Sequence, residues 1–391
     1  MPKPNLRALR EADALRDAGW GVLFLSWIKA TGLRQDTAPT PYPVRRIFVP
    51  VPPVGTSPFR RWRAYTRAAN RLWSTARAEK PDLVVAHDFE VLRVGAALKR
   101  WNRIPLIYDA HEDYPSIAAE NSVFEARIAA RLERRWCRRV DHVVTVSEPL
   151  ASKYRAWGRP ATVLSNARST REIQRADREA ARRAFGYGPD DFVVGFTGVL
   201  APRRGLAPLL EALAGMRPSV KALIVGGREE DAARLRARAA AMGVSARVRI
   251  DPQRPYGELA PYFAAMDLGV MLLEPRFARG LSGRPRTAAE TLTLQTAGNL
   301  PNKLFDYMAH GVPVLVPDYP AMGGVVREIG CGWTVPEVSP GAIRAALDGI
   351  LRSEDRGARA ERGRSAYETR YAWDHQAPLF LRLARDLTSR R

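Results

Sequence analysis

Apolar and polar positions follow two alternating patterns along the whole chain. Short apolar runs such as PDLVVA (81–86), VKALIV (220–225) and VPVLV (312–316) have the length and composition of strands that are buried on both faces. Longer stretches between these runs carry apolar residues at helical spacing. Because strands and helices alternate in both halves of the chain, the sequence predicts an α/β fold with parallel sheets.

The alternation pauses once, in a polar, arginine-rich stretch over residues 165–190 that has no strand pattern. A chain of 391 residues is also too long to form a single core. We therefore expect one domain over 1–170, a linker over 171–190, a second domain over 191–370 and a C-terminal helical segment over 371–391.

Composition narrows the class of protein. No apolar run approaches the roughly 20 residues that a membrane-spanning helix requires, and the N-terminal stretch lacks the apolar core of a secretory signal. Two isolated cysteines, Cys137 and Cys331, form neither a disulfide framework nor a metal knuckle. The five histidines include no pair at metal-ligand spacing, so we predict no metal site and a cytoplasmic location.

The formal net charge of +21 predicts attraction to an anionic partner. No zinc-finger, KH or RNP pattern is present, so we do not expect a nucleic-acid partner. An arginine-rich proteome is an alternative origin for part of this charge. Two predicted helices, over 59–80 and 123–139, combine many arginines with aromatic residues, which is typical of helices on an anionic membrane surface. The same pattern also fits a solvated helix face whose aromatic residues point into the core.

The most informative stretch is LPNKLFDYMAHGVPVLVPD, over 300–318, which predicts a helix followed by a buried strand. The first backbone N–H groups of that helix, at Asn302, Lys303 and Leu304, would point outward and favour an anion. Lys303 adds a full positive charge, and Asp306 can accept hydrogen bonds from ligand hydroxyls. A diphosphate that carries a sugar or ribose would suit these groups, although an ordinary helix–strand unit with a surface lysine fits the pattern equally well.

Other polar groups also follow predicted strands. Asp109 and His111 come at the end of the strand 104–109, and Arg203 and Arg204 come shortly after the strand 192–198. Ligands of parallel sheets bind beyond the carboxyl ends of the strands. We therefore expect these residues, with Lys303 and Asp306, to face a single cleft.

The stretch 300–318 resembles the donor-site signature of glycosyltransferase family 4. LIYDAHEDYP (106–115) and VGFTGVLAPRRGLAPLLEAL (194–213) resemble further family motifs, and the resemblance covers nearly the whole chain. It implies the GT-B fold, in which two Rossmann-like domains with parallel sheets face a central cleft. The domain 1–170 would bind the acceptor, the domain 191–370 the nucleotide sugar, and the helix over 371–391 would pack back on the first domain. The family's first strand and the glycine-rich loop after it have no counterpart in the sequence, so we expect either that the chain starts too late or that the N-terminal domain lacks this strand.

The resemblance also implies roles for individual residues. His111, with Asp109 beside it, would be catalytic and contact the donor sugar near the reacting carbon. Arg204 and Lys303 would bind the donor diphosphate, and Asp306 replaces a glutamate that usually holds the ribose. The rest of the expected donor site consists of Gly198, Arg203, Gly205, Asn302 and Leu304. The sequence departs from the family pattern at Val199, where a second basic residue is common, and at Gly298, where a glutamate is usual.

The function implied is transfer of a hexose from a nucleotide sugar, most simply a UDP- or GDP-sugar, to a glycan, lipid-linked or small-molecule acceptor. We expect retention of configuration, no bound metal and no cofactor, because the nucleotide sugar is a substrate. The protein would be cytoplasmic, with a peripheral site at the inner face of the membrane. The alternative is a non-catalytic relative that binds a nucleotide sugar or assists a partner enzyme.

Overall fold

The computed structural model describes residues 6–28, 42–52, 57–121, 123–274, 298 and 300–389. These residues form two compact units. Unit 1 contains the described residues up to Leu164 and those from Gln376 onward, and unit 2 contains the described residues between Ser165 and His375. Each unit has its own parallel sheets and its own buried cores, as the strand–helix alternation predicts.

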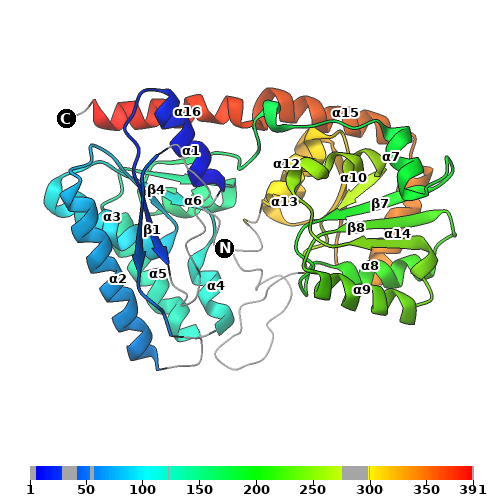
Figure 1. Ribbon diagram of the computed structural model, residues 1–391, viewed down its shortest axis with the longest axis horizontal. Coiled ribbons are helices and arrows are strands. Elements are labelled where there is room, and N and C mark those ends of the chain that lie inside the picture. Colours follow the sequence, from blue (N-terminus) through cyan, green and yellow to red (C-terminus); the bar gives the residue numbers. More distant parts are fainter. Residues whose placement is uncertain are drawn as a thin grey trace. The chain divides into compact units, whose positions relative to one another are not determined.

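Unit 1 is built on a four-stranded parallel sheet in the order β3-β4-β5-β6, with a separate parallel pair β1-β2 (Figure 1). In the sheet, His87 at the end of one strand lies in register with Asp109 of the next. The elements are α1 (Leu6–Asp17), β1 (Phe24–Ile28), β2 (Val44–Phe48), α2 (Pro58–Ala78), β3 (Val84–His87), α3 (Phe89–Asn102), β4 (Leu106–Ala110), α4 (Tyr114–Asn121), α5 (Val123–Cys137), β5 (His142–Thr145), α6 (Glu148–Ala156), β6 (Ala161–Val163) and most of α16 (Trp373–Thr388).

The first strand of unit 1 lies four residues later than the apolar run WGVLFL (20–25) indicates. Trp20 and Val22 have no strand conformation, because they pack instead against a small core that contains Leu15 of α1 and Phe380 of α16. Strand pairing begins only at Phe24, which lies opposite Val44 of β2. The apolar run therefore contains residues that pack in a core and residues that pair as a strand. The pattern of apolar positions alone does not distinguish the two.

Unit 2 contains a six-stranded parallel sheet in the order β12-β11-β10-β7-β8-β9. The chain fills one side of the sheet from β7 to β9 and then returns to fill the other side from β10 to β12, so the strand order reverses between β7 and β10. Ligands of open α/β sheets bind at such a reversal, beyond the carboxyl ends of the strands. The elements are η1 (Thr170–Glu172), α7 (Arg178–Phe185), β7 (Phe192–Thr197), α8 (Leu206–Ala214), β8 (Val220–Val225), α9 (Glu229–Ala241), η2 (Ser245–Arg247), β9 (Val248–Asp251), η3 (Tyr256–Glu258), α10 (Ala260–Ala265), β10 (Leu268–Val270), α12 (Asn302–Ala309), β11 (Val314–Pro317), α13 (Pro320–Ile329), β12 (Gly332–Val335), α14 (Pro340–Arg352), α15 (Arg356–Ala366) and η4 (Tyr367–Tyr371).

Two segments of unit 2 differ from the sequence pattern. The stretch expected as a linker, 171–190, contains the helix α7, whose Ala181 belongs to the core of unit 2 and whose first turn is capped by Asp177. The pattern also gives no indication of α13, because its centre carries two adjacent glycines, which weaken a helix by about 1 kcal/mol each relative to alanine. Burial of Met322 and Val326 against the core offsets that penalty.

None of the helices that the structure describes combines the length and the apolar character that a membrane crossing requires.

Candidate active site

The donor-side candidates of unit 2 gather where the strand order reverses. Gly198 follows β7 in a left-handed conformation, with φ of 125°. A Cβ atom at this position would lie 2.8 Å from the Lys303 ammonium nitrogen. The lysine side chain therefore reaches back from the start of α12 across the backbone at the end of β7. Only glycine provides both the required φ and the space for this approach.

Lys303 is placed in an unusual environment for an ammonium group. Its Nζ lies 4.1 Å from the centroid of the Phe196 ring, and the residue is partly buried. Burial and the nearby positive charge of Arg204 lower the pKa of Lys303 to about 7, and the more modest attraction of Asp306 opposes this shift. Lys303 in the first turn of α12 and the nearby Arg204 in the loop before α8 form an environment that favours an anion.

The loop that carries Arg203 and Arg204 is fixed by its backbone. Arg203 has a φ of 66°, and its carbonyl accepts a hydrogen bond of 3.0 Å from the Glu274 amide. Gly205 has a φ of 68°, and a Cβ atom there would lie 2.1 Å from the carbonyl oxygen of Leu272, just beyond β10. Close contact with the end of β10 thus sets the loop conformation, and it leaves the Arg203 side chain exposed while Arg204 is partly buried.

One predicted donor-binding residue does not fit its expected role. The Leu304 amide donates a hydrogen bond of 3.0 Å to the carbonyl of Pro301, and its side chain is fully buried in the core. The prediction that this N–H group points outward is therefore wrong, because the first turn of α12 closes on its own cap. Asn302 lies exposed at the first position of α12, ahead of this turn.

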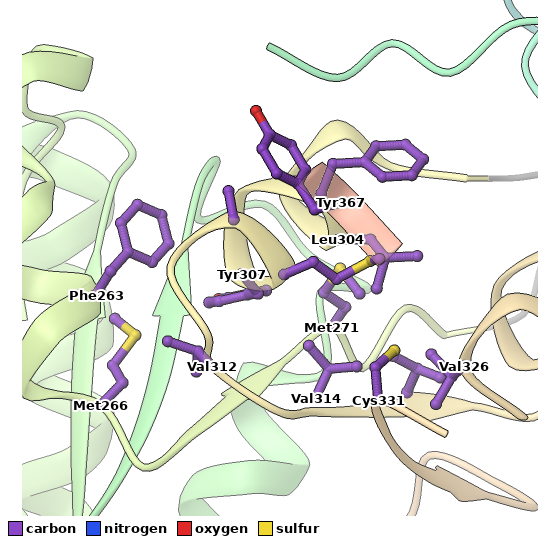
Figure 2. Close-up of a cluster of buried hydrophobic side chains, with 14 of the residues drawn as sticks. Phe263, Met266, Met271, Leu304, Tyr307, Val312, Val314, Val326, Cys331 and Tyr367 are labelled. Carbon is purple, nitrogen blue, oxygen red and sulfur yellow. The ribbon is translucent and has the colours of Figure 1, made fainter. Parts of the chain in front are cut away.

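A phenol group fixes the position of α12 relative to the sheet. The Tyr307 hydroxyl accepts a hydrogen bond of 3.0 Å from the Thr197 amide and donates one of 3.3 Å to the Gly195 carbonyl. Figure 2 shows Tyr307 and Leu304 among the buried side chains of this core, together with Val312 and Val314 from the segment that leads into β11. The helix that carries Lys303 is thereby joined directly to β7, the strand that ends just before Gly198.

Asp306 is held by an ion pair within unit 2. Its Oδ1 lies 3.3 Å from Nε of Arg168, and the guanidinium of Arg168 lies 3.3 Å from the centroid of the Tyr256 ring. Both charged side chains keep 17% exposure, so the carboxylate is oriented but still accessible. The structure thus places Gly198, Arg204, Lys303 and Asp306 in one neighbourhood of unit 2. Sequence reasoning did not identify Arg168 or Tyr256.

In unit 1, the two catalytic candidates are in direct contact. His111 Nε2 lies 2.5 Å from Asp109 Oδ2, and the Asp109 side chain is fully buried in β4. The backbone amide of His111 donates a hydrogen bond of 3.4 Å to the Asp88 carboxylate. Nδ1 of the His111 ring lies 3.7 Å from the same carboxylate. Burial alone would lower the pKa of His111, but the negative charge of Asp109, assisted by Asp88, raises it above its ordinary value.

Asp109 Oδ2 has two further partners that the sequence analysis missed. His87 Nδ1 and Arg7 Nε each lie 3.0 Å from this oxygen. Burial opposes ionisation of Asp109, but Arg7 and His111 hold its pKa well below its ordinary value. His87 could have been found, because AHD (86–88) follows a strand next to the strand that ends in Asp109. No sequence signal pointed to Arg7, which lies in the first turn of α1.

His87, Asp109 and His111 also form, among the residues that the structure describes, the one group whose composition could suit a metal ion, with ligand atoms within 4.8 Å of one another. The Arg7 guanidinium shares the same carboxylate oxygen and would repel a divalent cation at that point. The chemistry of the group therefore fits a hydrogen-bonded cluster around Asp109 better than a metal centre.

Two known protein families match the chain, one over each half. Residues 4–167 match the family described as Glycosyl transferase 4-like domain, and residues 177–369 match Glycosyl transferases group 1. The chain belongs to glycosyltransferase family 4. The resemblance seen in the motifs of the sequence is thus confirmed.

Individual family 4 relatives are distant in sequence. The D-inositol 3-phosphate glycosyltransferase of Acidothermus cellulolyticus is 26% identical over 354 residues, which cover 84% of this chain and 72% of the relative. The enzyme of the same name from Nocardia farcinica is 25% identical, over 76% of this chain and 64% of its own length.

Solved structures place the chain in the GT-B fold. Sucrose-phosphate synthase from Thermosynechococcus elongatus superposes with a TM-score of 0.74 at 18% identity and covers 98% of this chain and 92% of its own. Anabaena HepE in complex with UDP gives a TM-score of 0.71 at 20% identity, over 100% of this chain and 98% of its own. The predicted α/β class with two Rossmann-like domains is therefore confirmed.

Proposed function

We propose that this family 4 protein is a retaining glycosyltransferase that moves a hexosyl group from a UDP- or GDP-sugar to a glycan, lipid-linked or small-molecule acceptor, without a bound metal or cofactor. The observation that carries the proposal is the Lys303 ammonium over Gly198, with the positive charge of Arg204 near it, at the reversal of strand order in unit 2. The crystal structure of Anabaena HepE with UDP-glucose, a neighbour of the same fold, supports a nucleotide-sugar donor.

The chemistry assigned to each residue follows from its charge and position. When the bond between sugar and diphosphate breaks, negative charge develops on the departing phosphate oxygen. Fixed cations at Lys303 and Arg204 stabilise that charge without a metal ion. Asp306 binds hydroxyl groups of the nucleotide ribose, and Gly198 lets the backbone approach the diphosphate. His111, oriented by Asp109, contacts the donor sugar near the reacting carbon.

A donor screen with two variants tests the proposal. Thermal shift with UDP-, GDP- and ADP-sugars identifies the donor, and calorimetry then measures its affinity for Lys303→Ala and Arg204→Ala. Each lost charge-assisted contact should cost about 1.5–3 kcal/mol, which is roughly 10- to 150-fold in Kd. Lys221→Ala is the matched control, because this lysine lies in the same unit and pairs only loosely with Asp191, at 3.8 Å. Unchanged affinity in both site variants would remove the assignment.

A non-catalytic nucleotide-sugar-binding protein is the second candidate, and one observation favours it. Asp306, which takes the place of a longer glutamate, is already engaged by Arg168 in the unliganded protein. Such a protein would bind the donor with the same dependence on Lys303 but would neither hydrolyse nor transfer the sugar. Release of free nucleotide from the donor, followed over hours with and without candidate acceptors, separates the two functions.

We further propose that unit 1 docks on an anionic membrane surface. Four apolar side chains are exposed at the N-terminal ends of α2 and α5: Phe59 at 62%, Trp62 at 59%, Phe124 at 72% and Ile128 at 40%. An ion pair of 3.3 Å between Arg61 and Glu125 joins the two helices and makes these side chains one patch. The sequence left open whether such aromatic residues lie in the core, and these two aromatic residues of α2 do not.

Charge around this patch matches an anionic surface. The exposed arginines that share its helix faces are Arg60, Arg63, Arg67, Arg127, Arg131 and Arg135. Each arginine near anionic lipid contributes on the order of 1 kcal/mol, so several together give reversible binding. We expect sedimentation with phosphatidylserine vesicles but not with neutral ones, and loss of binding as salt shortens the Debye length. Trp62→Ser should weaken binding, whereas Trp101→Ser, at an exposed tryptophan outside the patch, should not. Equal recovery with neutral and anionic vesicles would refute the docking proposal.

A further inference from the structure

The inner face of α1 is charged, which is unusual for a helix packed against a sheet. Arg7 is fully buried and Glu11, one turn later, keeps only 2% exposure, beside the small apolar residues Ala8 and Ala12. Burial of ionisable groups is costly unless they are paired and hydrogen-bonded or, as for a carboxyl group, protonated. Arg7 and Glu11 lie next to the end of β4, and their burial there needs a reason beyond the packing of α1.

Arg7 joins three separate parts of unit 1. Its Nε lies 3.1 Å from Glu11 Oε1 and 3.0 Å from Asp109 Oδ2, and its Nη1 donates a hydrogen bond of 3.0 Å to the Leu164 carbonyl. The planar guanidinium can hold all three partners at once in one orientation, which a flexible ammonium group cannot do. Arg7 thus determines where the carboxylate of Asp109 lies.

The same oxygen of Asp109 holds both imidazole rings. His111 Nε2 at 2.5 Å and His87 Nδ1 at 3.0 Å converge on Oδ2, next to the Arg7 contact. An ionised carboxylate accepts hydrogen bonds only, so both ring nitrogens that face it carry a proton. Asp109 thereby fixes the tautomer and the ring plane of His111.

We propose that Arg7 is a positioning residue for His111, because its buried guanidinium fixes the Asp109 carboxylate and neutralises part of the charge that the carboxylate presents to the ring. The enzymatic meaning of this inference rests on the proposed function, in which His111 contacts the donor sugar. Without Arg7, the two imidazoles remain as hydrogen-bond partners of the buried carboxylate. The protonated form of His111 is then favoured further, because Arg7 no longer offsets the negative charge of Asp109.

Several other groups contribute to the charge around His111. Asp88 faces Nδ1 from the start of α3, His87 faces the ring from β3 with ring centroids 5.6 Å apart, and Glu11 lies behind Arg7 on α1. Glu112 and Asp113 follow His111 in its own loop. Removal of Arg7 takes a positive charge away from this set, and while Asp109 stays ionised between its two imidazole partners the pKa of His111 should rise.

Histidine NMR on the full chain tests the proposal directly. The protein has only five histidines, so ring signals can be assigned with single His→Gln variants. In Arg7→Met, the pKa of His111 should rise by about one unit, since one nearby charge typically shifts a pKa by one to three units. Arg7→Lys keeps the charge and should restore most of the wild-type pKa. Arg16→Met is the matched control, because this arginine lies on the same helix, is partly exposed and pairs with Asp13 and Asp17.

The outcomes separate this inference from the proposed function. A His111 pKa and tautomer unchanged in Arg7→Met overturn the inference, even where sugar transfer is normal. The expected pKa shift in a protein that neither binds nor transfers a sugar supports the inference and removes the proposed function. In an active enzyme, the low-pH limb of the kcat profile should move upward together with the His111 pKa. If Arg7→Met does not fold, Arg7→Gln, which keeps hydrogen-bond donors without the charge, is measured in its place.

Discussion

Donor binding should weaken as the pH rises above 7, because Lys303 has to carry its proton to bind a diphosphate. Burial and Arg204 lower the pKa of Lys303 to about 7 in the unliganded protein. The diphosphate of a nucleotide sugar is esterified at both ends, so its own charge stays constant over this range. A bound diphosphate stabilises the ammonium form, and binding above pH 7 therefore takes up a proton.

The size of the effect follows from the cost of protonating Lys303. Each pH unit above the pKa adds about 1.4 kcal/mol to the free energy of binding, which is a tenfold rise in Kd. We expect Kd to be nearly constant below pH 6.5, to rise about tenfold by pH 8, and to approach 100-fold by pH 9. These are upper values, because Lys303 is partly exposed and water screens the charges around it.

Calorimetry at pH 8 in two buffers with different ionisation enthalpies measures the proton uptake itself. The wild type should take up close to one proton for each donor bound. Lys303→Met should bind weakly, with no uptake and no dependence on pH, and Lys303→Arg should bind with no dependence on pH. A wild-type Kd that is flat from pH 6 to 9, without proton uptake, would refute the assignment of Lys303 to the diphosphate.

Three further predictions concern the reaction and unit 1. His111→Ala should stay folded and keep most of its nucleotide affinity but lose about tenfold or more in kcat, since the contact strengthens in the transition state; normal turnover would make His111 a bystander. Activity should survive exhaustive chelation, and a complete loss that Mn²⁺ or Mg²⁺ restores would contradict a metal-free mechanism. Burial and the Asp109 carboxylate raise the pKa of Glu11 to about 8, above its unfolded value of about 4.5, so the stability that its proton provides is present at low pH and is lost as the pH rises through 8. Glu11→Gln should therefore gain stability relative to the wild type as the pH rises from 5 to 8, by up to about 4 kcal/mol at about 1.4 kcal/mol per pH unit, and melting curves with no pH trend in the difference would contradict this.

The sequence predicted the candidate site of unit 2 better than that of unit 1. The helix at Lys303 and the strand after it could be read because an apolar run, a glycine and helical spacing occur together in one local stretch. The contact between Lys303 and Gly198 joins residues more than a hundred positions apart. Only the family motifs, and not periodicity, linked these two positions.

Unit 1 shows where hydrophobic patterning fails. In α1, Leu6 is 44% exposed, and the buried face carries Arg7 and Glu11 beside alanines and Leu15. A pattern that treats charged residues as exposed cannot predict this, because the pairing that makes their burial possible comes from Asp109 in a distant strand. The position of β1 was missed for a related reason, since Trp20 and Val22 are apolar for packing against α16 and not for strand pairing.

The hydrogen bond between the Thr197 amide and the Tyr307 hydroxyl provides a built-in reporter for hydrogen exchange. This amide donates to a side chain of α12, so we expect its exchange with solvent to require movement of the helix away from the end of β7. Its exchange rate therefore measures how often the helix that carries Lys303 separates from the sheet, even in the absence of substrate. A slow rate at Thr197, unchanged by added nucleotide, would mean that this part of the donor site is assembled before the donor arrives.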